Sequence, residues 1–109
     1  MGKRAGGKIK AKLRRSTLAP DQLSAFQAFS QVVFSDGAID AKSKQLIAVA
    51  VAHVTQCPYC IAGHTRAAAI AGATPQQIMA ADWIAAEMRA GAAVARSRHA
   101  LQALNGTGE

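Results

Sequence analysis

Hydrophobic residues recur every three or four positions through most of this chain, which is the spacing of amphipathic helices. Between 21 and 34 they form one helix face. A second helix is expected over about 41–55, and it is apolar nearly all round from Leu46 to Val54 apart from His53. A helix of that kind is buried on several sides. The apolar face of the first helix comprises Leu23, Phe26, Phe29, Val32 and Val33.

Residues typical of helix caps predict where the helices begin. Asp40 suits the N-cap of the second helix. A third helix is expected from Pro58 to about Ala71, because proline is favoured at the first helical position. A fourth begins at Thr74-Pro75, and Gly91 is expected to interrupt it. The last helix would then run over about 92–104.

The composition favours an all-α fold of one domain. Alanine is the commonest residue, and it is the strongest helix former. Valine and isoleucine do not alternate with polar residues as they do in strands. Small side chains let helices approach closely, so we expect packing between subunits in a homo-oligomer. The helical domain is assigned to residues 18–109 and a basic tail to residues 1–17.

The net charge of +7 belongs to the tail and not to the domain. The first fifteen residues carry seven Lys or Arg and no acidic residue, and the rest of the chain is balanced. This argues against the whole protein being a nucleic-acid binder. The tail is either a solvated arm or an arm that touches nucleic acid, acidic lipid or a neighbouring subunit.

No apolar run reaches the roughly 20 residues that a membrane span requires. The longest, Leu46 to Ala52, is far shorter, and the basic tail is not followed by the apolar core of a signal peptide. We therefore expect a cytoplasmic protein without a membrane span. In that compartment a close cysteine pair is more often catalytic or metal-binding than structural.

Cys57-Pro58-Tyr59-Cys60 holds both cysteines of the chain, and His64 follows four residues later. If a helix starts at Pro58, Cys57 is its N-cap and Cys60 lies in its first turn. The helix dipole and the unpaired amides there favour a thiolate. His64 lies one turn beyond Cys60 and can face it. A thiol beside a base, with a second thiol in reach, suits thiol–disulfide or peroxide chemistry.

Two further polar residues precede the dithiol at helical spacing. His53 lies four residues before Cys57, and Gln45 lies eight before His53. We expect both to share a face that points toward the dithiol. A zinc site built from His53, Cys57, Cys60 and His64 is the alternative. A c-type haem is excluded, since histidine does not follow Cys60 directly.

These residues resemble a known family. The segments Lys44–Ala52, Gln56–Cys60, His64-Thr65 and Ala71–Thr74, with the later Ala86–Ala93, are similar to the AhpD-like alkylhydroperoxidases of the carboxymuconolactone decarboxylase superfamily. The resemblance covers roughly residues 18–104. It implies an AhpD-like helical bundle that assembles as a trimer or hexamer, with thiol-dependent (peroxiredoxin-type) reduction of hydroperoxides.

The resemblance also implies roles for single residues. Cys60 would attack the peroxide, Cys57 would resolve the intermediate, and His64 would belong to a proton relay. The relay normally includes a glutamate where this chain has Gln45. Glutamine cannot exchange a proton at neutral pH. The relay then passes through His53, or His64 suffices alone, or the protein is a weak peroxidase that mainly transfers disulfides.

The sequence leaves the attacking sulfur open. The helix dipole favours Cys57, whereas the pairing with His64 and the family resemblance favour Cys60. An antioxidant oxidoreductase of this type needs an external dithiol, such as a lipoyl-bearing or thioredoxin-like protein, and no bound cofactor. The alternative function is a non-enzymatic helical assembly module that holds a partner with its basic arm.

Overall fold

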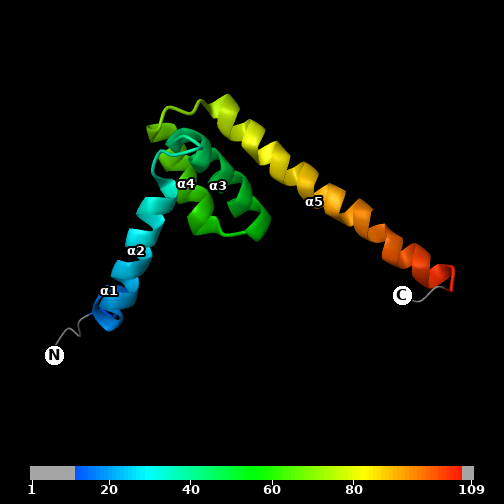
Figure 1. Ribbon diagram of the computed structural model, residues 1–109, viewed down its shortest axis with the longest axis horizontal. Coiled ribbons are helices and arrows are strands. Elements are labelled where there is room, and N and C mark those ends of the chain that lie inside the picture. Colours follow the sequence, from blue (N-terminus) through cyan, green and yellow to red (C-terminus); the bar gives the residue numbers. More distant parts are fainter. Residues whose placement is uncertain (1–11, 107–109) are drawn as a thin grey trace, which may run out of the picture. The chain divides into compact units, whose positions relative to one another are not determined.

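The computed structural model describes residues 12–106, and these residues fall into two compact units that divide between Phe34 and Ser35 (Figure 1). The first unit contains α1 (Arg15–Leu18) and α2 (Pro20–Phe34). The second contains α3 (Ala41–Thr55), α4 (Pro58–Ile70) and α5 (Pro75–Leu104). All regular structure in the described residues is helical, which confirms the all-α fold class.

The first unit consists of two helices with no buried side chain. The rings of Phe26 and Phe29 lie one turn apart on α2, with their centroids separated by 6.4 Å. Most of the predicted basic tail lies outside the described residues. Its last residues, from Arg15 on, form α1 together with Leu18. The boundary at residue 17 and the role of the tail stay predictions.

The second unit is built around α3, which packs against both α4 and α5. Its core consists almost entirely of methyl groups, because Val49 is the one fully buried large side chain in the described part of the chain. The other buried hydrophobic residues there are Ala52, Ala68, Ala73, Ala81 and Ala85. Leu46 and Ile78 cover the edge of this cluster. Alanine side chains allow the helix backbones to lie close together.

The predicted starts of α3, α4 and α5 are confirmed. Asp40 accepts a hydrogen bond from the Ser43 amide at the start of α3, and Pro58 and Pro75 occupy the first turns of α4 and α5. At α5 the cap is stronger than expected. The Thr74 hydroxyl accepts from the Gln77 amide, and the Gln77 side chain accepts from the Thr74 amide. This reciprocal pair is a capping box.

The expected interruption at Gly91 is wrong, since α5 runs unbroken from Pro75 to Leu104. A single glycine inside a helix costs only about 1 kcal/mol relative to alanine. Here it lies among alanines, which are strong helix formers, so the helix continues through it.

Large hydrophobic side chains remain exposed on every long helix of the second unit, including Ile47 and Val51 of α3. On α5, Met79, Trp83 and Met88 are more than half exposed, so they are not core residues within this unit. None of the described helices combines the length and the apolar character needed to cross a membrane.

The Asp40 cap makes the stability of α3 depend on pH. Hydrogen bonds from the Ser43 amide (2.8 Å) and then from the Ser43 hydroxyl (3.2 Å) lower the pKa of the Asp40 carboxyl below its ordinary 3.8. A carboxyl with a lowered folded-state pKa stabilises the fold above its unfolded-state pKa. That contribution is lost as pH falls through the lower folded-state value.

We expect the thermal midpoint of the wild type to exceed that of Asp40→Asn by a constant amount above about pH 5, and the difference to shrink below it. Asparagine keeps an acceptor at the cap and removes the titration. Circular dichroism melts of both proteins between neutral and acid pH test this. A difference that is the same at every pH would contradict it.

Candidate active site

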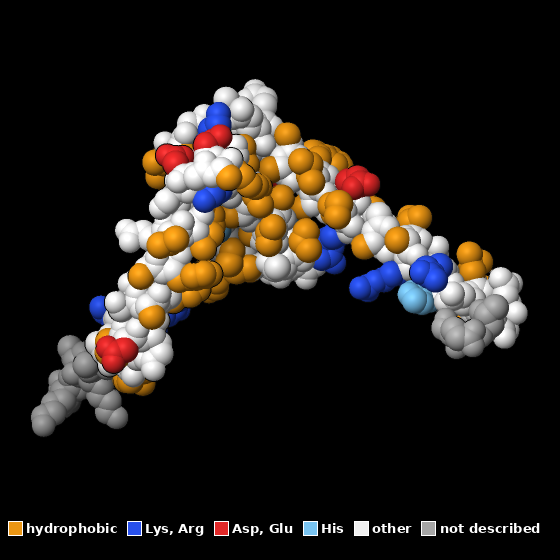
Figure 2. Space-filling view, viewed as in Figure 1, with side chains coloured by type: hydrophobic (Ala, Val, Ile, Leu, Met, Phe, Trp, Pro, Cys, Tyr) orange, Lys and Arg blue, Asp and Glu red, His pale blue; other side chains and the backbone are white. Residues whose placement is uncertain are grey.

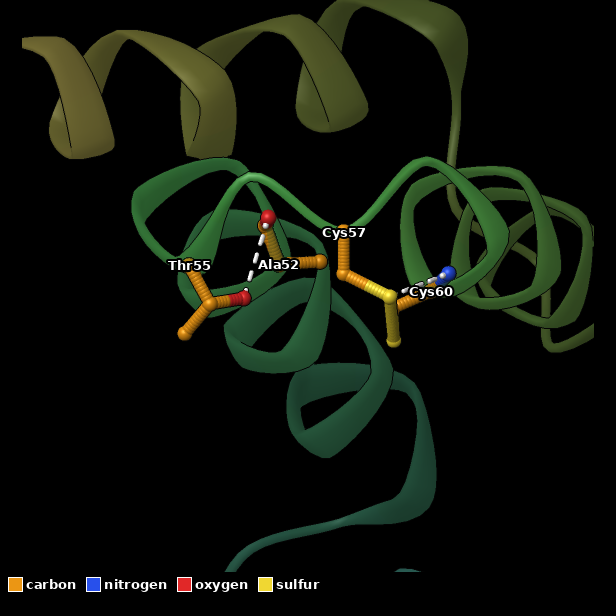
Figure 3. The surroundings of a disulfide bond; sticks show 4 residues. All are labelled: Ala52, Thr55, Cys57 and Cys60. Atoms are coloured by element: carbon orange, nitrogen blue, oxygen red, sulfur yellow. Dashed lines mark hydrogen bonds between the residues drawn. A yellow bond between two sulfur atoms is a disulfide. The ribbon is translucent and has the colours of Figure 1, made fainter.

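A tight turn joins α3 to α4 and places both cysteines. Gln56 ends α3 in the left-handed region with φ 59° and ψ 43°. This conformation lets the Cys57 amide reach back to the Ala52 carbonyl at 3.1 Å. The Thr55 hydroxyl donates to the same carbonyl at 3.2 Å (Figure 3). The last turn of α3 is thus closed by the residue that begins the next helix.

Cys57 is also the N-cap of α4, as the sequence predicted. Its Sγ accepts a hydrogen bond from the Cys60 amide at 3.2 Å (Figure 3). The two cysteines form a disulfide, with their Cα atoms 5.2 Å apart. Cys60 is exposed and Cys57 is half-buried. In the dithiol state the Cys60 amide and the helix dipole would stabilise negative charge on the Cys57 sulfur at this helix start.

His64 faces α3 and contacts Gln45. Its Nδ1 lies 2.8 Å from Gln45 Oε1, a contact across 19 residues of sequence. With the amide oxygen as acceptor, Nδ1 donates its hydrogen and Nε2 keeps a lone pair. A neutral imidazole in this tautomer can take a proton from a thiol. Gln45, where the family resemblance implies a glutamate, therefore positions the imidazole without exchanging protons.

His53 faces α5, and its polar contacts are not with the dithiol. Its Nδ1 lies 2.8 Å from the Val49 carbonyl and 2.7 Å from Asp82 Oδ1. The hydrogen of Nδ1 is aligned with the carbonyl of the preceding turn. The contact with Asp82 is therefore electrostatic, and the buried Oδ1 has no hydrogen-bond partner among the described residues. A cavity of about 340 Å³ opens beside the pair.

Arg89 of α5 holds the end of α3 at a second point. Its Nη1 donates to the Val54 carbonyl at 2.8 Å. Carbonyls in the last turn of a helix lack intrahelical partners and carry the negative end of the dipole, so a guanidinium there is favourable. Asp82 and Arg89, seven residues apart on one face of α5, thus flank the segment that leads into Cys57.

The structure brings together only part of the predicted site. Gln45 of α3 contacts His64 of α4, and Cys57 is bonded to Cys60 where these two helices join, whereas His53 is turned to α5. Among residues 12–106, no group of three His, Cys, Asp or Glu side chains could hold a metal ion. The zinc alternative therefore finds no support in the described residues.

Sequence reasoning missed Asp82 and Arg89. The available signal was their position: Ile78, Ala81 and Ala85 mark the face of α5 that meets α3. Asp82 and Arg89 lie on its border. A charged residue beside an apolar stripe predicts a polar contact across the helix interface.

Several known proteins are similar to this chain in sequence or in fold. A model of the carboxymuconolactone decarboxylase family matches residues 20–104. A Paracoccus denitrificans protein described as uncharacterized protein 4 in the cox locus is 64% identical over 81 residues, covering 74% of this chain and 73% of its own length. An uncharacterized Haemophilus influenzae protein is 41% identical over 49 residues, or 45% of this chain and 43% of its own.

Two crystal structures have similar folds. One is the apo form of a carboxymuconolactone decarboxylase family protein from Legionella pneumophila, with 29% identity and a TM-score of 0.66. The similarity covers 87% of this chain and 85% of that one. The other is a protein from Methanobacterium thermoautotrophicum, with 30% identity, a TM-score of 0.74, and coverage of 79% and 97%.

The contact between Arg89 and Val54 yields a local prediction. Replacing Arg89 with methionine keeps the aliphatic stem but removes the donor to the Val54 carbonyl. A hydrogen bond of this kind contributes about 1 kcal/mol, so amide exchange at Cys57 should accelerate about five-fold. Hydrogen exchange measured by NMR checks this. Arg66→Met, at an exposed position on α4, is the control. Equal acceleration in both variants would contradict a stabilising role of the Arg89–Val54 hydrogen bond.

Proposed function

The chain belongs to the carboxymuconolactone decarboxylase family, and we propose that it acts as a thiol-dependent oxidoreductase that reduces hydroperoxides through Cys57 and Cys60. The observation that carries this proposal is the disulfide at the start of α4, with the exposed Cys60 one turn from an imidazole. A cysteine pair at a helix start, on a protein surface, favours redox chemistry over a purely structural bridge.

In the first step the Cys60 thiolate attacks the terminal oxygen of the hydroperoxide. The O–O bond breaks, the alkoxide takes up a proton and leaves as an alcohol, and Cys60 becomes a sulfenic acid. Cys60 suits this role because it is the more exposed residue of the pair. His64 Nε2 can accept the thiol proton and return it to the leaving oxygen.

In the second step Cys57 attacks the sulfenic sulfur. A disulfide forms and water leaves with the former hydroxyl oxygen, so two thiols and one peroxide yield a disulfide, an alcohol and water. Two hydrogen bonds hold Cys57 in place for this step. Its amide donates to the Ala52 carbonyl, and its Sγ accepts from the Cys60 amide. Cys57 is half-buried, so it is the less accessible residue of the pair to an outside peroxide.

An external dithiol must then regenerate the enzyme. It becomes oxidised as it transfers two electrons and two protons to the disulfide. The exposure of Cys60 and of the neighbouring Tyr59, which is 89% exposed, supports attack by a thiol carried on another protein. A lipoyl group or a thioredoxin-like protein fits this requirement, and no bound cofactor is needed.

The glutamine at position 45 determines the rate of peroxide turnover that we expect. Its amide orients His64 but cannot pass a proton onward, so proton transfer ends at one imidazole. We therefore propose slow peroxide turnover, with disulfide transfer to or from the external dithiol as the faster half of the cycle. His53 is not included in the relay, because its described contacts are with Val49 and Asp82.

The cysteine roles are tested by single replacements. We expect Cys60→Ser to lose peroxide consumption, and Cys57→Ser to consume about one equivalent and stop at a sulfenic acid on Cys60. Mass spectrometry with a sulfenic-acid trap identifies the modified residue. Trapping on Cys57 in the Cys60→Ser protein would instead assign the attack to Cys57. Inertness of both sulfurs in the reduced wild type would end the peroxidase proposal.

Gln45→Glu tests the relay. A carboxylate beside His64 Nδ1 supplies the missing proton-exchanging group, so turnover should rise by about ten-fold or more. Steady-state rates are measured with saturating dithiol, and the wild type is compared at the same pH. Gln76→Glu adds the same charge at an exposed position at the start of α5 and is the control. An unchanged rate in Gln45→Glu would remove the relay from the mechanism.

A further inference from the structure

An apolar groove lies between α3 and α5, and neither cysteine lines it. Its volume is about 820 Å³, which is within the range of small-molecule sites. All but two of the side chains that line it are apolar. The larger apolar ones on its walls are more than a third exposed, namely Ile47, Val51, Val54, Ile84 and Met88. A contiguous exposed apolar surface of this kind indicates a binding site.

The two charged side chains of the groove are both arginines. Arg89 and Arg96 are seven residues apart on α5, so they share a helix face with Ala85 and Ala92, which also line the groove. None of the lining residues is acidic. Figure 2 shows basic side chains on the half of α5 that is nearer to the C-terminus. The groove is therefore apolar along its length and positively charged toward one end.

Both guanidinium groups have donors to offer to an anion. Arg89 uses Nη1 for the Val54 carbonyl, where it offsets the negative end of the α3 dipole. Arg96 is exposed and makes no hydrogen bond or ion pair within the described part of the chain. The planar fork of a guanidinium matches a carboxylate in shape and charge. We therefore expect Arg96 to supply most of the attraction for an anion and Arg89 to add to it.

We propose that the groove binds one free long-chain fatty carboxylate. The carboxylate lies between Arg89 and Arg96, and the alkyl chain follows the apolar lining toward Ala81. From Ala92 to Ala81 the helix rises about 16 Å. An extended alkyl chain advances about 1.3 Å per carbon, because a C–C bond is about 1.5 Å long, so about 12 to 14 carbons fill this length.

Charge and apolar lining together select this class of ligand. An anionic head group satisfies the guanidinium groups, and an unbranched alkyl chain covers the apolar lining. An uncharged alcohol of the same length meets only the second requirement, and a cationic amphiphile is repelled by the arginines. The groove is separate from the dithiol, so this proposal goes beyond the peroxidase function and does not rest on it.

The first test is calorimetric titration of the full-length protein with free carboxylates of increasing length. We expect one tetradecanoate per chain. From octanoate to dodecanoate the affinity should rise about two- to four-fold for each methylene, because each one is buried. The rise should stop near tetradecanoate, since further carbons extend beyond the groove. Tetradecanol and tetradecyltrimethylammonium, the head-group controls, should bind at least about ten-fold more weakly.

Three outcomes of this titration would overturn the proposal. An affinity that keeps rising through octadecanoate would indicate adsorption of the alkyl chain without a defined site. Equal affinity for the three head groups would exclude a role for the arginines. Absence of binding would show that the groove is not open to a ligand, as would be the case if a second copy of the chain covered it.

A charge variant locates the head group. Arg96→Met keeps most of the aliphatic stem and removes the donors, so the dissociation constant for tetradecanoate should rise about ten-fold or more. Arg98→Met removes the same charge two residues further along α5, at an exposed position outside the groove, and should keep the wild-type value. Equal weakening in both variants, or an unchanged constant in Arg96→Met, would contradict the proposed site.

A pair of isoleucine variants locates the alkyl chain. Ile84→Asp places a carboxylate in the groove and should weaken tetradecanoate binding about a hundred-fold or more. Ile70→Asp, at an exposed position at the end of α4, is the matched control and should bind as the wild type does. Circular dichroism checks that both variants stay helical. Wild-type binding by Ile84→Asp would overturn the proposal. The peroxidase assays depend on Cys57 and Cys60, so the two proposals fail separately.

Discussion

One backbone turn determines where the two cysteines of this molecule lie. Gln56 adopts a left-handed conformation, and this allows Cys57 to end α3 with its amide and to begin α4 with its side chain. The same residue thus satisfies backbone groups of two helices. Both cysteines lie within one turn of this junction. The Cys57 sulfur accepts a hydrogen bond from the Cys60 amide, and amides at a helix start favour negative charge. The position of the cysteine pair follows from how the two helices are joined.

The two histidines next to this junction have different surroundings. His64 contacts the side chain of Gln45 on α3 through its Nδ1 atom. His53 lies at the interface with α5, between the Val49 carbonyl and Asp82. Their distances from the cysteines in sequence are equal, since each lies four residues from one of them. Packing assigns them to different helix interfaces, and only one of these interfaces contains the dithiol.

Sequence patterns predicted the features that depend on residues close together in the chain. The starts of α3, α4 and α5 were predicted from Asp40, Pro58 and Pro75, because caps act over three or four residues. The position of His64 one turn after Cys60 follows from helix geometry alone. Gln45 was correctly connected with His64 through the family resemblance, although the two are 19 residues apart.

Other features depend on contacts between helices, and the sequence did not reveal them. The continuity of α5 through Gly91 was missed because one glycine is a weak signal against the alanines around it. The contacts of Asp82 with His53 and of Arg89 with Val54 depend on how α5 crosses α3. Helical periodicity identifies which face is apolar, but it does not give the crossing position. The direction of His53 was mispredicted for the same reason.

The alanine core sets a limit on the spacing of the helices. Ala68 is completely buried and lies one turn beyond His64 on α4, and Val49 lies one turn beyond Gln45 on α3. A single methyl group therefore acts as the spacer between the two helices next to the imidazole–amide contact. A larger side chain at position 68 would push the helices apart and stretch that contact, since a close-packed interior cannot absorb added volume locally. The geometry of the contact between His64 and Gln45 is thus limited by an alanine of the core.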